Sequence, residues 1–94
     1  MRISGIIWLE EIEEKLYSKH SVAPTEVIEA LENHAQFRFV EKGHRPGENV
    51  YLALAQTDAG RYLIVFFIYK VDRRALILSA RDMTRTERRQ YENR

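Results

Sequence analysis

The hydrophobic positions in the first third of the chain recur with the spacing of two amphipathic helices. Over residues 8–17, Trp8, Ile12 and Leu16 stand four residues apart with acidic residues between them, which is typical of a helix with one buried face. Pro24 suits the first turn of a second helix, because its missing N–H needs no partner there. The buried stripe of the second helix is expected to be Val27, Ile28 and Leu31.

Four strands are predicted after these helices, at residues 36–41, 50–56, 62–69 and 74–80. The run from Tyr62 to Tyr69 is apolar throughout, as expected of a central strand covered on both faces. Short connections at 57–60 and 71–73 indicate that the last three strands form an antiparallel meander. The residues expected in or near the core of the sheet are Phe37, Phe39, Leu52, Leu54, Leu63, Val65, Phe67, Leu76 and Leu78.

The last element has a clear start but almost no apolar face. The segment Thr84-Arg85-Thr86-Glu87 is a capping-box sequence, so a helix should begin at Thr84. Tyr91 is the one large apolar residue after it. A helix of this kind buries little, and its arginines are therefore available to a partner.

These elements predict one α+β domain over residues 1–94, with two N-terminal helices, a four-stranded antiparallel sheet and a C-terminal basic helix. The chain has no cysteine, which excludes disulfides and thiolate zinc sites and fits a reducing cytoplasm. The apolar run at residues 3–8 is too short for a signal peptide, and no run is long enough to span a membrane. We therefore expect a cytoplasmic protein.

The formal net charge of +1 hides an uneven distribution. Residues 1–32 carry seven acidic residues against three basic ones, whereas residues 70–94 carry one lysine and seven arginines against four acidic residues. Arginine binds phosphate and carboxylate in a bidentate manner, which favours an anionic partner for the C-terminal end. The alternative is a solvated surface whose arginines pair with local acidic residues.

The sequence contains no phosphate-binding loop, dinucleotide motif, zinc-binding helix or nucleophile elbow. His20, His34 and His44 lack ligand spacing, so we expect neither a metal nor a cofactor. What remains is the basic C-terminal segment and His20, which follows Lys19 at a predicted helix end. This set suits metal-free RNA cleavage: a histidine transfers protons to or from the 2′-hydroxyl or the leaving oxygen, and arginines stabilise the charged phosphate. A surface or helix-capping histidine is the alternative.

Two separated blocks resemble the BrnT family of toxins. Near the N-terminus, Trp8 and Lys19-His20-Ser21-Val22 stand at the family's spacing. Near the C-terminus, Leu78-Ser79-Ala80-Arg81 and the stretch from Thr84 to Glu92 match the family pattern Thr-Arg-X-Glu-Arg-X-X-Tyr-Glu. Gly47-Glu48 and Gly60-Arg61 also stand where the family has a Gly-Glu and a Gly-Arg.

The resemblance implies a RelE-like fold, RNA cleavage without a metal, growth inhibition, and neutralisation by a BrnA-like antitoxin. It leaves the target RNA and a homo- or hetero-oligomeric state open. The predicted catalytic residues, which should meet on one rim of the sheet, are His20, Arg81, Arg88 and Tyr91. The predicted RNA-binding residues beside them are Lys19, Arg85 and Arg89.

The chain departs from the family pattern at Leu16, Ser21, Ala23 and Val50, where the family has asparagine, glycine, serine and arginine. The missing arginine motivates a second hypothesis, a non-catalytic interaction module of the same fold. A plain RNA- or DNA-binding protein is a weaker third, because the net charge is only +1. For two site residues there is also a structural alternative, in which Arg81 pairs with an acidic residue of the helix and Tyr91 only anchors that helix.

Overall fold

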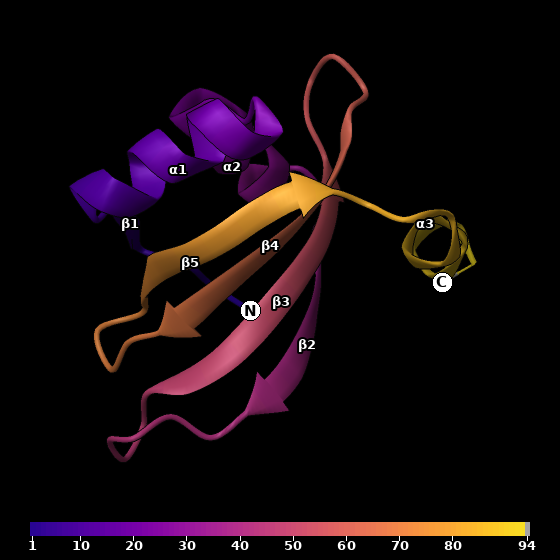
Figure 1. The fold of residues 1–94 in the computed structure, drawn as a ribbon. Coiled ribbons are helices and arrows are strands. Elements are labelled where there is room, and N and C mark those ends of the chain that lie inside the picture. Colours follow the sequence, from indigo (N-terminus) through magenta and orange to yellow (C-terminus); the bar gives the residue numbers. More distant parts are fainter. Residues whose placement is uncertain (94) are drawn as a thin grey trace.

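The computed structural model describes residues 1–93, which form three helices and a five-stranded mixed sheet (Figure 1). The strands are β1 (Gly5–Ile7), β2 (Gln36–Glu41), β3 (Asn49–Gln56), β4 (Tyr62–Tyr69) and β5 (Arg74–Asp82). The helices are α1 (Glu10–His20), α2 (Pro24–Glu32) and α3 (Arg85–Glu92). The strand order in the sheet is β1-β5-β4-β3-β2.

The four predicted strands are confirmed as β2 to β5, and each pairs antiparallel with its neighbour. The prediction of a purely antiparallel, four-stranded sheet is wrong, because β1 adds a fifth strand. Residues Gly5 to Ile7 pair in parallel with Arg74 to Leu76 at the edge of β5. A three-residue strand has too few positions to show a periodic pattern, and its pairing partner is almost seventy residues away in the sequence.

One face of the sheet packs against α1 and α2 and holds the larger core. Leu63, Val65 and Phe67 of β4 lie on this face and are fully buried. Residues of the helical layer cover them, including Leu16, Val22, Val27 and Ala30. The helix predicted from residue 8 begins two residues later, at Glu10, so Trp8 packs against the core from outside the helix.

The opposite face of the sheet carries a smaller core under α3. Tyr91 packs there against Leu54 and Ile64, with Tyr62 and Phe66 partly buried around them. Strand β4 therefore has apolar contacts on both faces, which explains its uninterrupted apolar sequence. Strand β4 is the third of the five strands in the sheet, so it is the central strand, as predicted.

Most of the expected core residues lie in or beside one of these cores. Leu54, Leu63, Val65 and Phe67 are buried, whereas Phe37, Leu52, Leu76 and Leu78 are half-buried. The prediction for Phe39 is wrong, because its side chain is 55% exposed. Phe39 lies on the outermost strand, and α2 packs over β3 and β4 instead. Ile28 of α2, expected in the buried stripe, is 36% exposed and borders an open pocket with Trp8 and Phe37.

The capping box predicted at the start of α3 is confirmed. Thr84 is the N-cap residue, and its hydroxyl oxygen accepts a hydrogen bond from the backbone N–H of Glu87 (3.2 Å). The Glu87 carboxylate accepts one in return from the backbone N–H of Thr84 (2.8 Å). Within residues 1–93 no helix is long and apolar enough to cross a membrane.

Candidate functional site

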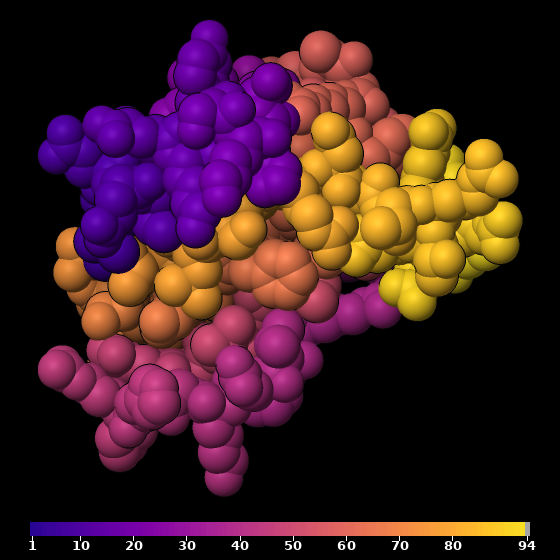
Figure 2. All heavy atoms as spheres, viewed as in Figure 1, coloured from indigo at the N-terminus to yellow at the C-terminus, as the bar shows by residue number. Residues whose placement is uncertain are grey.

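The end of the sheet where β5 stops and β4 begins brings several charged segments together. The link between α1 and α2, the β3–β4 turn and the start of α3 all lie at this end (Figure 1). We call it the α3 rim and define it as His20, Arg61, Tyr62, Arg81, Asp82 and the residues of α3. In the space-filling view α3 forms a projecting yellow lobe beside the end of β5 (Figure 2). The predicted site residues all belong to this rim or to the adjoining end of α1.

Arg61 holds three segments of the rim together. Its Nε and Nη2 donate to the Asp82 carboxylate at 2.7 and 3.1 Å, and its Nη1 lies 3.1 Å from Glu26 Oε1. The same guanidinium donates to the backbone oxygens of His20 (2.9 Å) and Ser21 (2.8 Å). The hydrogen bond from Arg61 lowers the pKa of Asp82, and the charges of Arg61 and His20 contribute in the same direction. Arg61 therefore fixes the backbone from which the His20 side chain projects.

His20 is the last residue of α1 and is exposed to solvent. The chain leaves the helix through Ser21, whose φ of 52° lies in the left-handed region. The backbone N–H groups of Ser21 and Val22 donate to the oxygens of Tyr17 and Leu16, which closes the helix end. Glycine is the residue that adopts this conformation without strain, so the serine here strains the backbone beside His20.

Arg81 lies near the end of β5 and forms a bidentate ion pair with Glu87 of α3. The Nη1–Oε1 and Nη2–Oε2 distances are 2.8 and 2.9 Å. The hydrogen bonds from Arg81 lower the pKa of Glu87 to about 2, and those from Thr84 add to the effect. Because Glu87 also caps the helix, this ion pair sets the position of α3 relative to β5. The contact agrees with the structural alternative for Arg81.

Tyr91 fastens α3 to the sheet, and Arg88 covers an aromatic ring next to it. Only 6% of Tyr91 is exposed, and its ring meets the Tyr62 ring edge to face at a centroid distance of 6.1 Å. The Arg88 guanidinium carbon lies 3.9 Å from the centroid of the Tyr62 ring, a cation–π contact. The Tyr62 hydroxyl donates a hydrogen bond to Glu92 Oε2 at 3.1 Å. The same carboxylate oxygen lies 3.9 Å from Arg88 Nε. Tyr91 thus anchors the helix, while Arg88 and Tyr62 lie towards the surface.

The three predicted RNA-binding residues, Lys19, Arg85 and Arg89, are all exposed. Within residues 1–93 they take part in none of the ion pairs of the rim. The structure brings His20 next to Arg61 and Asp82, and Arg88 next to Tyr62 and Tyr91. Arg61 and Tyr62 are consecutive residues, so their side chains project to opposite faces of the sheet: the His20 group lies on the face of α1 and α2, and the Arg88 group lies on the face of α3.

Sequence reasoning missed the roles of Arg61 and Tyr62. The only signal was the Gly60-Arg61 pair, which stood out by its resemblance to a family motif and carried no assigned role. Gly60 has a φ of 92° and makes the turn that presents Arg61 to the rim. The partners of Arg61 lie 21 to 41 residues away in the chain, so the sequence does not reveal them.

Val50, the position where the resembled family has arginine, is far from the α3 rim. It lies at the start of β3, six residues before the strand ends at Gln56, a span of about 20 Å at 3.3 Å per residue. Val50 lines a separate cavity of about 430 Å³ beneath the β2–β3 loop, with Lys42, Arg45 and Ile68. Leu16, the position of the family's asparagine, is a core residue. The charged groups of the rim are therefore arranged without either family residue.

No histidine, aspartate and glutamate side chains within residues 1–93 gather in a group that could hold a metal ion. In comparisons with known proteins, no family model matches the chain and no curated protein matches it. The resemblance to BrnT toxins consequently depends on the sequence motifs alone.

Proposed function

We propose that this protein is a metal-independent endoribonuclease toxin of a type II toxin–antitoxin pair, with the RelE-like fold of the BrnT proteins it resembles. The proposal places it in the bacterial cytoplasm and RNA cleavage at the α3 rim. The observation that supports it best is the exposed His20, whose backbone Arg61 holds at the same end of the sheet from which the arginine-rich α3 begins. Phosphodiester cleavage requires an acid–base group and cations held on a fixed framework.

In the proposed reaction the 2′-hydroxyl of the RNA attacks the adjacent phosphorus and the 5′-oxygen leaves. His20 takes the proton from the 2′-hydroxyl or gives one to the leaving 5′-oxygen, and solvent water carries the other of these two protons. Arg88 and Arg85 contact the phosphate oxygens, whose negative charge rises as the fifth bond forms. Lys19 and Arg89 bind flanking phosphates, and Tyr62 offers an aromatic face to a base when Arg88 moves onto the phosphate. The products are a 2′,3′-cyclic phosphate and a 5′-hydroxyl end.

In this proposal Arg81 and Tyr91 contact RNA only after a rearrangement of the rim. Arg81 reaches an RNA phosphate only by giving up its two hydrogen bonds to Glu87, and Tyr91 reaches one only if α3 moves. In the geometry described here both act as positioning residues: they set the place of α3 and so of Arg88.

The second candidate is a non-catalytic interaction module of the same fold. The Arg81–Glu87 ion pair and the burial of Tyr91 favour it, because they engage two predicted catalytic groups in structural contacts. Both candidates bind an acidic antitoxin through the arginines of α3. They differ in whether the protein alone is toxic.

Controlled expression in a bacterial host separates the two. We expect the protein to arrest growth and co-expression of an antitoxin encoded beside its gene to restore growth. His20→Ala should abolish the arrest, whereas His44→Ala, a change of an exposed histidine at the other end of the sheet, should preserve it. A parent protein that binds the antitoxin but never arrests growth would favour the non-catalytic module.

A further inference from the structure

The outer edge of the sheet is an exposed strand with apolar side chains. Strand β2 is the last of the five strands, and Arg38, Phe39, Val40 and Glu41 are all exposed. Phe39 is 55% exposed and Val40 41% exposed. Proteins usually keep edge strands short or charged, because an open row of backbone groups pairs with other strands. A six-residue edge with two exposed apolar side chains is suited to such pairing.

The backbone groups on this open edge can be identified. Thr57 N–H donates to Arg61 O across β3 and β4, at 2.9 Å. Backbone groups alternate sides along a strand, so the odd-numbered residues of β3 bond to β4 and the even-numbered ones to β2. Before the register shift in β2, Leu54 and Leu52 of β3 pair with Gln36 and Arg38 of β2. The N–H and C=O groups of Phe37 and Phe39 therefore point away from the sheet.

The charges along β2 complement those of a second copy. The strand contains a bulge at Val40, where the register with β3 shifts. Arg38 and Glu41 have partners on β3 that are two residues apart, so both side chains lie on the same face of the sheet. In a two-fold antiparallel pair, Arg38 can stand opposite Glu41 of the second copy, and Glu41 opposite Arg38. Phe39 then meets Val40 of the second copy in the same register.

The competing registers are less favourable. Centring the pair on Arg38 would place two arginines opposite each other, which is destabilising. Centring it on Phe39 would place Glu41 opposite Phe37, on the other face of the sheet, with no compensating charge. Arg38 is available for the favoured register, because its present hydrogen bonds to Gln90 and Gln36 are long, at 3.4 and 3.5 Å.

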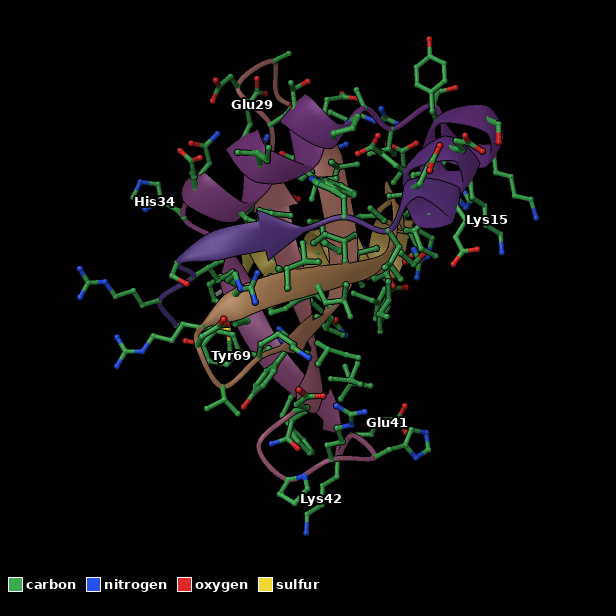
Figure 3. The ribbon with its side chains drawn as sticks, turned by 90° about the vertical axis from the view of Figure 1, so that its left-hand side faces the viewer. Lys15, Glu29, His34, Glu41, Lys42 and Tyr69 are labelled. Carbon is green, nitrogen blue, oxygen red and sulfur yellow. The ribbon has the colours of Figure 1, made fainter. Side chains whose placement is uncertain are left out.

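We propose that two copies of this chain associate through β2, with Arg38 of each copy opposite Glu41 of the other, to form one continuous ten-stranded sheet. This self-association is independent of the proposed ribonuclease function. In Figure 3, Glu41 and Lys42 mark the end of β2, and they lie at the opposite end of the molecule from Glu29 and His34, which belong to α2 and the residues after it. A single strand pair buries less than the area of a standard interface, about 1,600 Å², so the dimer should be weak and in equilibrium with monomer.

The test is sedimentation equilibrium of the full chain from micromolar to millimolar concentration. The average mass should rise from 11.2 kDa towards twice that value. Arg38→Glu and Glu41→Arg should each weaken association about tenfold, because each turns two attractive pairs into repulsive ones. The double variant places glutamate opposite arginine again and should restore association.

A mass of one chain at every concentration would overturn the proposal. A dimer that both single substitutions leave unchanged would place the interface elsewhere, and a double variant no tighter than the single ones would refute the register. Circular dichroism of each variant checks the fold. Should Arg38→Glu disturb α3 through Gln90, Glu41→Arg still decides the question, since Glu41 is exposed and makes no ion pair within residues 1–93.

Discussion

The ion pair between Arg81 and Glu87 gives the most quantitative prediction. Arg81 and the Thr84 cap lower the pKa of Glu87 from 4.5 to about 2, and the full equivalent of that change is about 3 kcal/mol. Both side chains are partly exposed, so solvent screening reduces the contribution to about 1–2 kcal/mol. Glu87→Gln keeps a side chain that can cap the helix but removes the charge. It should therefore lower the free energy of unfolding at pH 7 by about 1–2 kcal/mol.

The pH dependence of this loss is a stricter test. A carboxylate whose pKa is lower in the folded protein stabilises it fully above its unfolded pKa, and this stabilisation disappears as the pH falls through the folded pKa. The difference between parent and Glu87→Gln, measured by urea unfolding, should thus be constant above about pH 4.5 and shrink towards pH 2. Glu92→Gln, on the same helix but 3.9 Å from Arg88, should cost less than about 0.5 kcal/mol. A difference that persists unchanged at pH 2, or equal losses for both variants, would refute the role assigned to Arg81.

Three further predictions concern the rest of the rim. Ser21→Gly should raise the free energy of unfolding by about 0.5–1 kcal/mol, because glycine adopts the left-handed backbone at φ 52° without strain. Ser18→Gly within α1 should instead lower the free energy of unfolding by about as much. The prediction fails if Ser21→Gly does not stabilise the protein or if both glycine variants do. Arg61→Ala should lower the free energy of unfolding by about 2 kcal/mol, since it removes hydrogen bonds to the partly exposed carboxylates of Glu26 and Asp82 and to the backbone oxygens of the α1–α2 link, and a loss below about 0.5 kcal/mol would show that Arg61 does not hold the rim. Reversing the charges of Arg85 and Arg88 together should weaken binding of both RNA and antitoxin in a salt-dependent manner; antitoxin affinity that stays the same would separate the two binding surfaces.

Local signals in the sequence predicted the elements that depend on local interactions. The Thr84–Glu87 capping box is closed by hydrogen bonds between residues three apart, so four letters of sequence contain the whole motif. The apolar run of β4 predicted a central strand for a similar reason, since both of its faces contact apolar side chains.

Features that depend on distant pairing were not predictable in the same way. Strand β1 exists because Gly5 to Ile7 meet β5, and a three-residue run has no periodicity of its own. Alternation assigned Phe39 to the correct face of β2, the face of Phe37, but could not show that α2 stops short of the outermost strand.

The same distinction between local and distant interactions applies to the candidate site. Residue type alone identified His20 and the arginines of α3 as candidate chemistry. It could not show that Arg81 binds Glu87, six residues on, or that Arg61 holds the backbone of His20 from 41 residues away. The first contact depends on how α3 folds back towards the end of β5, and the second on the link between α1 and α2 lying next to the start of β4.

The most direct test of the proposed function is cleavage of RNA by the purified protein in the presence of EDTA. We expect the parent to release fragments that end in a 2′,3′-cyclic phosphate, and folded His20→Ala to cleave about a hundredfold more slowly. His44→Ala should cleave at the parental rate. Folded His20→Ala that cleaves as fast as the parent would remove His20 from the mechanism, and a parent that cleaves no RNA at all would contradict the ribonuclease function itself.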